Sequence, residues 1–156
     1  MKRFVLIVVA GTAFAVLVGP RGPLGGFWAP APTVPHVHGA VLVAFIAENM
    51  VENLAFGVGL AILVRGRQWF AARTTSPARA TTAWLATVWL FASWMPHAAL
   101  HLHIGIRPTA LLPVEWVFHG GAIAAMAALL AALLVPSRRA GIPSRHAAES
   151  VSTESV

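Results

Sequence analysis

Four long apolar runs, separated by segments rich in proline, glycine and arginine, most constrain how this chain can fold. They cover about residues 4–19, 38–64, 80–103 and 113–135. A transmembrane helix needs about 20 mostly apolar residues, and the first run is at the lower limit of that length. Since 58% of the chain is hydrophobic and only 10% is charged, one water-soluble core could not bury this surface. We therefore predict an all-α fold, a four-helix transmembrane bundle formed by residues 1–136.

The basic residues predict how this bundle is oriented. Nine of the eleven lysines and arginines lie at the N-terminus, between the second and third runs, or after the fourth run. Only Arg21 and Arg107 lie in the other gaps, so the positive-inside rule places both termini in the cytoplasm. The net charge of +6 then reflects topology, with the lipid bilayer and not nucleic acid as the expected partner. Residues 137–156 are polar and aperiodic, which predicts a disordered cytoplasmic tail.

The first run allows a second interpretation. Basic residues, a short apolar core and the segment Ala13-Phe14-Ala15 resemble a secretory signal peptide within about residues 1–20. Its removal would leave three spans with the same orientation. We favour a retained helix, because three spans would form a poorer bundle.

Six of the seven histidines fall at the predicted extracytoplasmic end of the bundle. Residues four apart share a helix face, so His97 and His101 form one pair. Glu115 and His119 form a second pair on the next helix. Pro96 removes a backbone hydrogen bond, which predicts a kink just before His97 and a cavity beside it.

The donors in this His/Glu cluster are those of a transition-metal site. The chain has no cysteine, and imidazole with carboxylate suits copper, zinc or iron. The expected metal ligands are His38, His97, His101, Glu115 and His119. The other version of this hypothesis is haem b, with His97 or His101 facing His119 as axial cofactor ligands. The alternative is a set of half-hydrated interfacial histidines without a ligand.

The second run carries a polar face made by Glu48, Asn49, Glu52 and Asn53. Carboxylates facing lipid at this depth would be costly, so we expect this face to turn into the bundle, toward His97. Glu48 and Glu52 are the candidate catalytic residues, for proton transfer or for chemistry on a lipid-soluble substrate. Asn49 and Asn53 are expected to hold helices together.

A resemblance to a known family is carried by residues 78–105, ARATTAWLATVWLFASWMPHAALHLHIG. This stretch resembles small bacterial four-helix membrane proteins grouped as DoxX-like, whose third span often ends in Pro-His-x-x-x-His. Here Pro96, His97 and His101 match that pattern, and the likeness covers roughly residues 38 to 135. The resemblance implies a four-helix fold in the bacterial plasma membrane and implies little about activity.

Three functions follow from these features. The first is metal or haem binding at the extracytoplasmic end, in electron transfer or in an oxidoreductase assembly. The second is a non-catalytic scaffold or accessory subunit that holds a membrane-protein partner or a second copy of the chain. The third is a small membrane enzyme that acts on a lipid-soluble substrate through Glu48 and Glu52. The sequence contains no P-loop, G-x-S-x-G or G-x-G-x-x-G motif that would indicate another chemistry.

Overall fold

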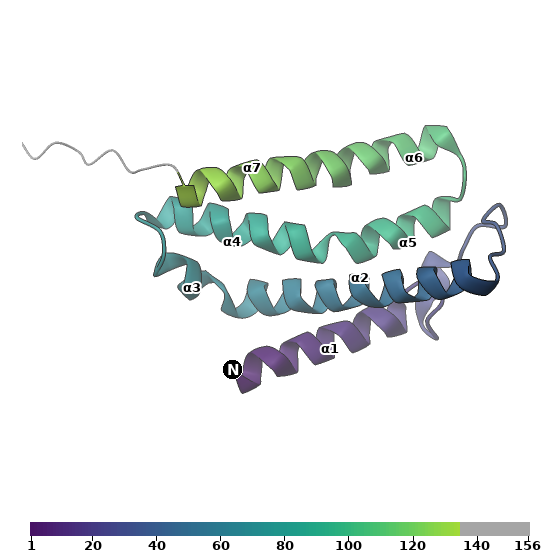
Figure 1. Ribbon diagram of the computed structural model, residues 1–156, viewed down its shortest axis with the longest axis horizontal. Helices are drawn as coiled ribbons and strands as arrows, with labels where there is room; N and C mark the ends of the chain where they lie inside the picture. Colours follow the sequence, from purple (N-terminus) through teal and green to yellow (C-terminus); the bar gives the residue numbers. More distant parts are fainter. Residues whose placement is uncertain (135–156) are drawn as a thin grey trace, which may run out of the picture.

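The computed structural model describes residues 1–134, and every regular element in this range is a helix. The all-α prediction is confirmed, whereas the expected tail at 137–156 lies outside the described residues. Four helical segments lie side by side, each antiparallel to the next (Figure 1). In chain order they are α1 (Lys2–Val18), α2 (Gly39–Arg65), α4 with α5 (Pro77–Ala92 and Trp94–Ile104), and α6, η2 and α7 (Pro108–Glu115, Trp116–Gly120 and Gly121–Leu134).

Glycines bring α1 and α2 close together. A Cβ atom added at Gly11 would lie 3.0 Å from the Cα atom of Gly57. A Cβ atom added at Gly57 would collide with the Val8 carbonyl and with Thr12 on α1. Small residues allow this approach of two backbones, which gives helices in lipid much of their packing energy.

The central contacts join α2 to α4 and α4 to α7. The indole Nε1–H of Trp84 on α4 donates to the Ile62 carbonyl of α2, at 2.9 Å. Phe70 of the short helix α3 (Arg67–Ala71) is buried with Ala83 and Ala132. These contacts hold the ends of α2, α4 and α7 together, away from the histidines.

The third apolar run forms two helices with a bend between them. Helix α4 begins at Pro77 and ends at Ala92. Pro77 lies in the first turn, where its missing N–H group costs no hydrogen bond. After Ser93 the chain continues as α5, with Pro96 in its first turn. Pro96 cannot donate to the carbonyl of Ala92, so the α-helical bonding breaks there. The kink predicted before His97 is confirmed, and Figure 1 shows it between α4 and α5.

The fourth segment begins at Pro108, earlier than the start expected at Pro113. Pro108 takes the first-turn position, and Pro113 lies inside the helix. There its ring crowds the carbonyl of Thr109 and removes one backbone hydrogen bond. The next turn, η2, is a π-helix, a wide turn that occurs often at functional sites.

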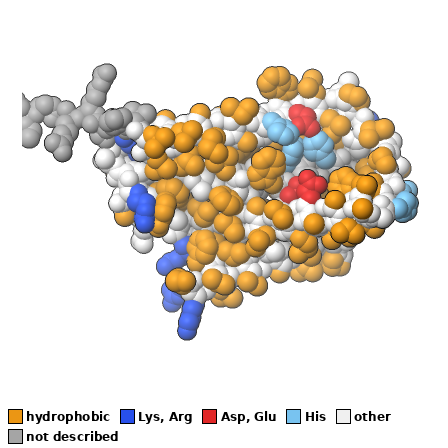
Figure 2. Space-filling model, in the orientation of Figure 1, with side chains coloured by type: hydrophobic (Ala, Val, Ile, Leu, Met, Phe, Trp, Pro, Cys, Tyr) orange, Lys and Arg blue, Asp and Glu red, His pale blue; other side chains and the backbone are white. Residues whose placement is uncertain are grey.

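Two helices among residues 1–134 are long and apolar enough to cross a membrane. They are α2 and the continuous helix Pro108–Leu134. Apolar side chains cover most of the face seen in Figure 2. On that face the Lys and Arg side chains gather mainly at the end where α3 lies, and the histidines lie in the opposite half.

Candidate metal centre

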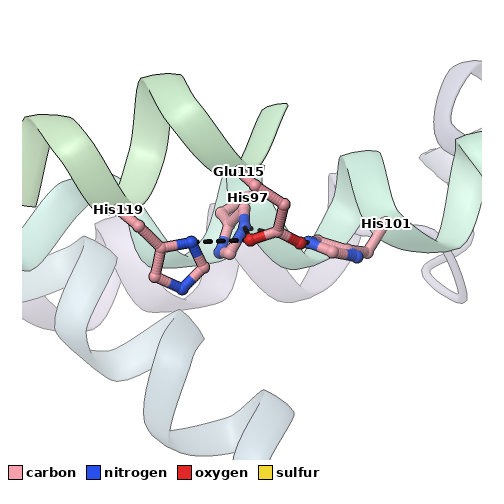
Figure 3. A network of polar contacts seen from close by, with 4 residues as sticks. All are labelled: His97, His101, Glu115 and His119. Atoms are coloured by element: carbon pink, nitrogen blue, oxygen red, sulfur yellow. Dashed lines mark hydrogen bonds and ion pairs between the residues drawn. The ribbon is translucent and has the colours of Figure 1, made fainter. Parts of the chain in front are cut away.

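A cluster of imidazole and carboxylate groups lies where α5 meets α6. His97 and His101 on α5 point toward Glu115 at the end of α6 (Figure 3). The Nε2 atom of His101 lies 2.8 Å from Glu115 Oε1 and 2.9 Å from His97 Nε2. His97 Nε2 lies 3.9 Å from Glu115 Oε2. One potential ligand atom from each residue lies within 4.8 Å of the others, so these three residues could hold a metal ion.

The separations between the ligand atoms can be compared with those around a metal ion. Ligand atoms about 2.1 Å from a tetrahedral zinc ion are about 3.4 Å apart. The distances of 2.8 and 2.9 Å at His101 are shorter than this, and 3.9 Å between His97 and Glu115 is longer. The distances of 2.8 and 3.9 Å involve different oxygens of Glu115, so side-chain rotations must bring one carboxylate oxygen and both Nε2 atoms to coordinating distance.

His119 joins the cluster through Glu115. Its Nδ1 atom lies 2.6 Å from Glu115 Oε2, one turn along the same helical segment. The His119 side chain is about half exposed, and its ring contacts that of His97 edge-on, with 4.9 Å between centroids. The carboxylate therefore lies between two imidazoles. A partner of this kind orients a ligating carboxylate and tunes its basicity.

Aromatic side chains fix the ring of His97. Phe118, in the π-helical turn, stacks on His97 with 4.9 Å between centroids and on Trp89 with 5.9 Å. Only 7% of His97 is exposed. Gly121 allows this arrangement, because a Cβ atom there would lie 2.8 Å from the Trp89 ring. Phe118 carried no signal in the sequence, since its role depends on the wide turn.

His38 does not belong to the group formed by His97, His101 and Glu115. It is the exposed N-cap residue of α2, and the metal-binding group found among the described residues is formed by His97, His101 and Glu115. His103 has a different setting, since its Nδ1 atom lies 3.2 Å from the Ala29 carbonyl. Its ring also stacks on Phe27, with 6.2 Å between centroids. His103 thus ties the loop before α2 to the end of α5.

Beside the cluster lies a cavity of about 500 Å³ between α5 and α2. On the α2 side it is lined by Glu48, Asn49 and Glu52, and on the other side by the three clustered histidines. Figure 2 shows acidic side chains on both sides of histidines on this face. Glu48 is exposed and Glu52 is half-buried, and within residues 1–134 neither carboxylate bonds to a histidine. A cavity is therefore present beside His97, as predicted.

The polar face of α2 continues along the helix past this cavity to Asn53. Asn53 is 2% exposed, and its Nδ2–H donates to Asn49 Oδ1 at 3.0 Å. Oδ1 of Asn53 has no partner within the described part of the chain. Among residues 1–134 the two asparagines bond to each other along α2 and to no other helix, which does not support the expectation that they hold helices together.

The described residues do not support haem b. Axial histidines must face each other across the macrocycle, whereas the rings of His97 and His119 already touch edge-on, as do those of His97 and His101.

A comparison with protein-family models, curated proteins and solved structures finds no match. The resemblance to DoxX-like proteins stays a prediction.

Proposed function

We propose that this chain is a membrane protein that binds one transition-metal ion through His97, His101 and Glu115. The observation that carries the proposal is the convergence of their three ligand atoms from α5 and α6. A buried histidine, a second imidazole and a carboxylate form a donor set that binds zinc, copper or iron. His119 is the residue that orients the carboxylate.

The protein is proposed to cross the bacterial plasma membrane four times, with both ends in the cytoplasm. The lengths and apolar character of α2 and of Pro108–Leu134 support two of these spans. The side-by-side packing of α1 against α2, and of α4 against α2 and α7, supports the other two. The separation of basic side chains from histidines supports the orientation. The metal site then lies near the outer face.

The donor set is compatible with two roles, which depend on the metal that is bound. Two histidines and one carboxylate serve catalytic zinc and non-haem ferrous iron in other proteins. Iron or copper bound here would transfer electrons, and the protein would then act within an oxidoreductase assembly. Zinc would instead activate a bound molecule as a Lewis acid.

Elemental analysis of the detergent-purified chain tests the proposal. We expect about one transition-metal ion per folded chain. His97→Ala and His101→Ala should abolish stoichiometric binding, while His38→Ala, a matched change at an exposed histidine, should leave it intact. Folded wild-type protein without bound metal would contradict the proposal and favour a scaffold, and a Soret band would indicate haem.

A further inference from the structure

The metal-binding group and the cavity share one wall. His97 and His101 line the cavity from α5, while Glu115 approaches them from α6 on the other side. The cavity continues from these imidazoles to α2. A metal ion held by the three residues would therefore have protein ligands on the side of α5 and α6 and open space on the side of α2.

Three protein ligands leave a coordination position open. Zinc sites with three protein ligands bind water or substrate at the fourth position, and closed structural sites use four. His119 is not one of the three residues of this group, and its Nδ1 atom contacts Glu115 at 2.6 Å. A ligand in the cavity would lie beside two of the three metal-binding residues, because His97 and His101 line it.

The cavity has the size and lining of a small-molecule site. Its volume of about 500 Å³ falls within the range of typical ligand pockets. Val37, Phe45 and Leu102 supply apolar wall. The carboxylates of Glu48 and Glu52 supply hydrogen-bond acceptors across from the histidines. Arg21 also lines the cavity, but its single positive charge is outnumbered by the two carboxylates, so the walls disfavour an anion and favour a neutral molecule that carries an N–H or O–H donor.

The position of the cavity indicates where a ligand enters. In the proposed topology, Glu48 lies about 15 Å along α2 from the outer end of the helix, which is within the hydrocarbon layer. Phe45 borders the cavity and is 46% exposed, so this wall reaches the lipid-facing surface. A ligand that dissolves in lipid reaches this opening directly.

We infer that this cavity binds a neutral, lipid-soluble molecule whose nitrogen or oxygen atom coordinates the metal ion and whose N–H or O–H group donates to the carboxylates of α2. The inference rests on the proposed metal site. It adds a ligand class to that site and gives Glu48 and Glu52 a binding role.

The test uses the full chain in detergent, loaded with Co²⁺, whose visible spectrum reports changes in coordination. The probe is 4-phenylimidazole, which combines a neutral metal-binding nitrogen, an N–H donor and an apolar ring. We expect a saturable shift of the Co²⁺ bands. Stoichiometric Co²⁺ binding without any spectral response to the probe would overturn the inference and leave the metal site itself intact.

Cavity-filling variants locate the probe. Ala98→Leu fills the cavity from α5. Phe45→Trp fills it from α2, at a position that is distant in the chain from His97, His101 and Glu115. Each should weaken probe binding at least about tenfold at unchanged Co²⁺ content. Ala124→Leu, the control, adds the same side chain as Ala98→Leu at an exposed site on α7 and should change nothing. Unchanged probe affinity in Phe45→Trp would overturn the inference, even if Ala98→Leu failed to bind cobalt.

A charge comparison tests the role of the carboxylates. Benzoate is similar in size to the probe but anionic, and it should bind more weakly to the wild-type site. The double change Glu48→Gln and Glu52→Gln should reduce the ratio of the two binding affinities several-fold. The change removes the repulsion between the carboxylates and the benzoate anion, while each Gln side chain keeps an acceptor oxygen. An unchanged ratio of affinities would show that Glu48 and Glu52 do not select neutral ligands, and this would overturn the inference.

Discussion

Glu115 Oε1 lies 2.8 Å from His101 Nε2, so a single carboxylate bridges the contact between α6 and α5. Its other oxygen, Oε2, lies 2.6 Å from His119 Nδ1. Both oxygens of Glu115 are therefore held by imidazoles before any metal arrives. In the proposed metal site these groups would already be held in place, so little conformational entropy would be lost on binding.

Replacing Glu115 tests whether it is a metal ligand. Glu115→Gln keeps the shape of the side chain but removes its charge, so zinc affinity should fall at least about 100-fold. Competition with a chelator of known affinity measures the change. Glu48→Gln makes the same substitution in the neighbouring cavity and should leave zinc affinity unchanged. Equal losses in both variants would contradict a ligand role specific to Glu115.

His119 is expected to act through Glu115. His119→Ala should lower metal affinity about 10- to 100-fold, the usual effect of losing the partner that orients a ligand. His101→Ala should lose binding altogether, because it removes a ligand atom. The same chelator competition compares them. If His119→Ala removed the metal as completely as His101→Ala, His119 would be a direct ligand.

The contact between α1 and α2 should be sensitive to one methyl group. Gly57→Ala places a Cβ atom against the Val8 carbonyl and Thr12, so it should destabilise the protein by about 1–3 kcal/mol. Thermal unfolding in detergent measures the loss. Gly120→Ala is the matched control, since a Cβ atom there meets nothing within 4 Å. Equal melting temperatures for Gly57→Ala and wild type would show that the two helices can shift enough to accept the methyl group without loss of stability.

Reporter fusions test the orientation. Green fluorescent protein fused after Val156 should fluoresce, because we expect that end in the cytoplasm. Alkaline phosphatase should be active when inserted after Ile106 and inactive when inserted after Arg73. Phosphatase activity at Arg73 would reverse the topology and place the histidines on the cytoplasmic side.

Helices and site residues differ in how well the sequence predicts them. Apolar runs bounded by proline and glycine predicted α1 and α2 to within a few residues. The four-residue spacing of His97 and His101 predicted that both rings share a face, and the structure brings them together with Glu115. Local spacing is sufficient for these inferences, because a helix repeats its geometry along its length.

Long-range packing accounts for what the sequence did not reveal. Nothing local distinguishes Pro108 from Pro113 as the start of a helix, and both residues are accommodated within it. His38 shares an end of the molecule with the cluster but lies at the exposed start of α2. The stacking of Phe118 between Trp89 and His97 depends on how α4, α5 and η2 meet. Contacts of this kind are set by tertiary structure and leave no periodic pattern in the sequence.

The wide turn at Trp116–Gly120 sets the phase of α6 against α7. A π-helical turn holds one more residue than the α-helical turn it replaces, and one residue turns a helix by about 100°. With one residue fewer in that turn, α7 could keep its packing on α4 while Glu115 rotated away from α5. A deletion of a single codon in this stretch would therefore separate the carboxylate from both imidazoles of α5 without removing any of the three residues.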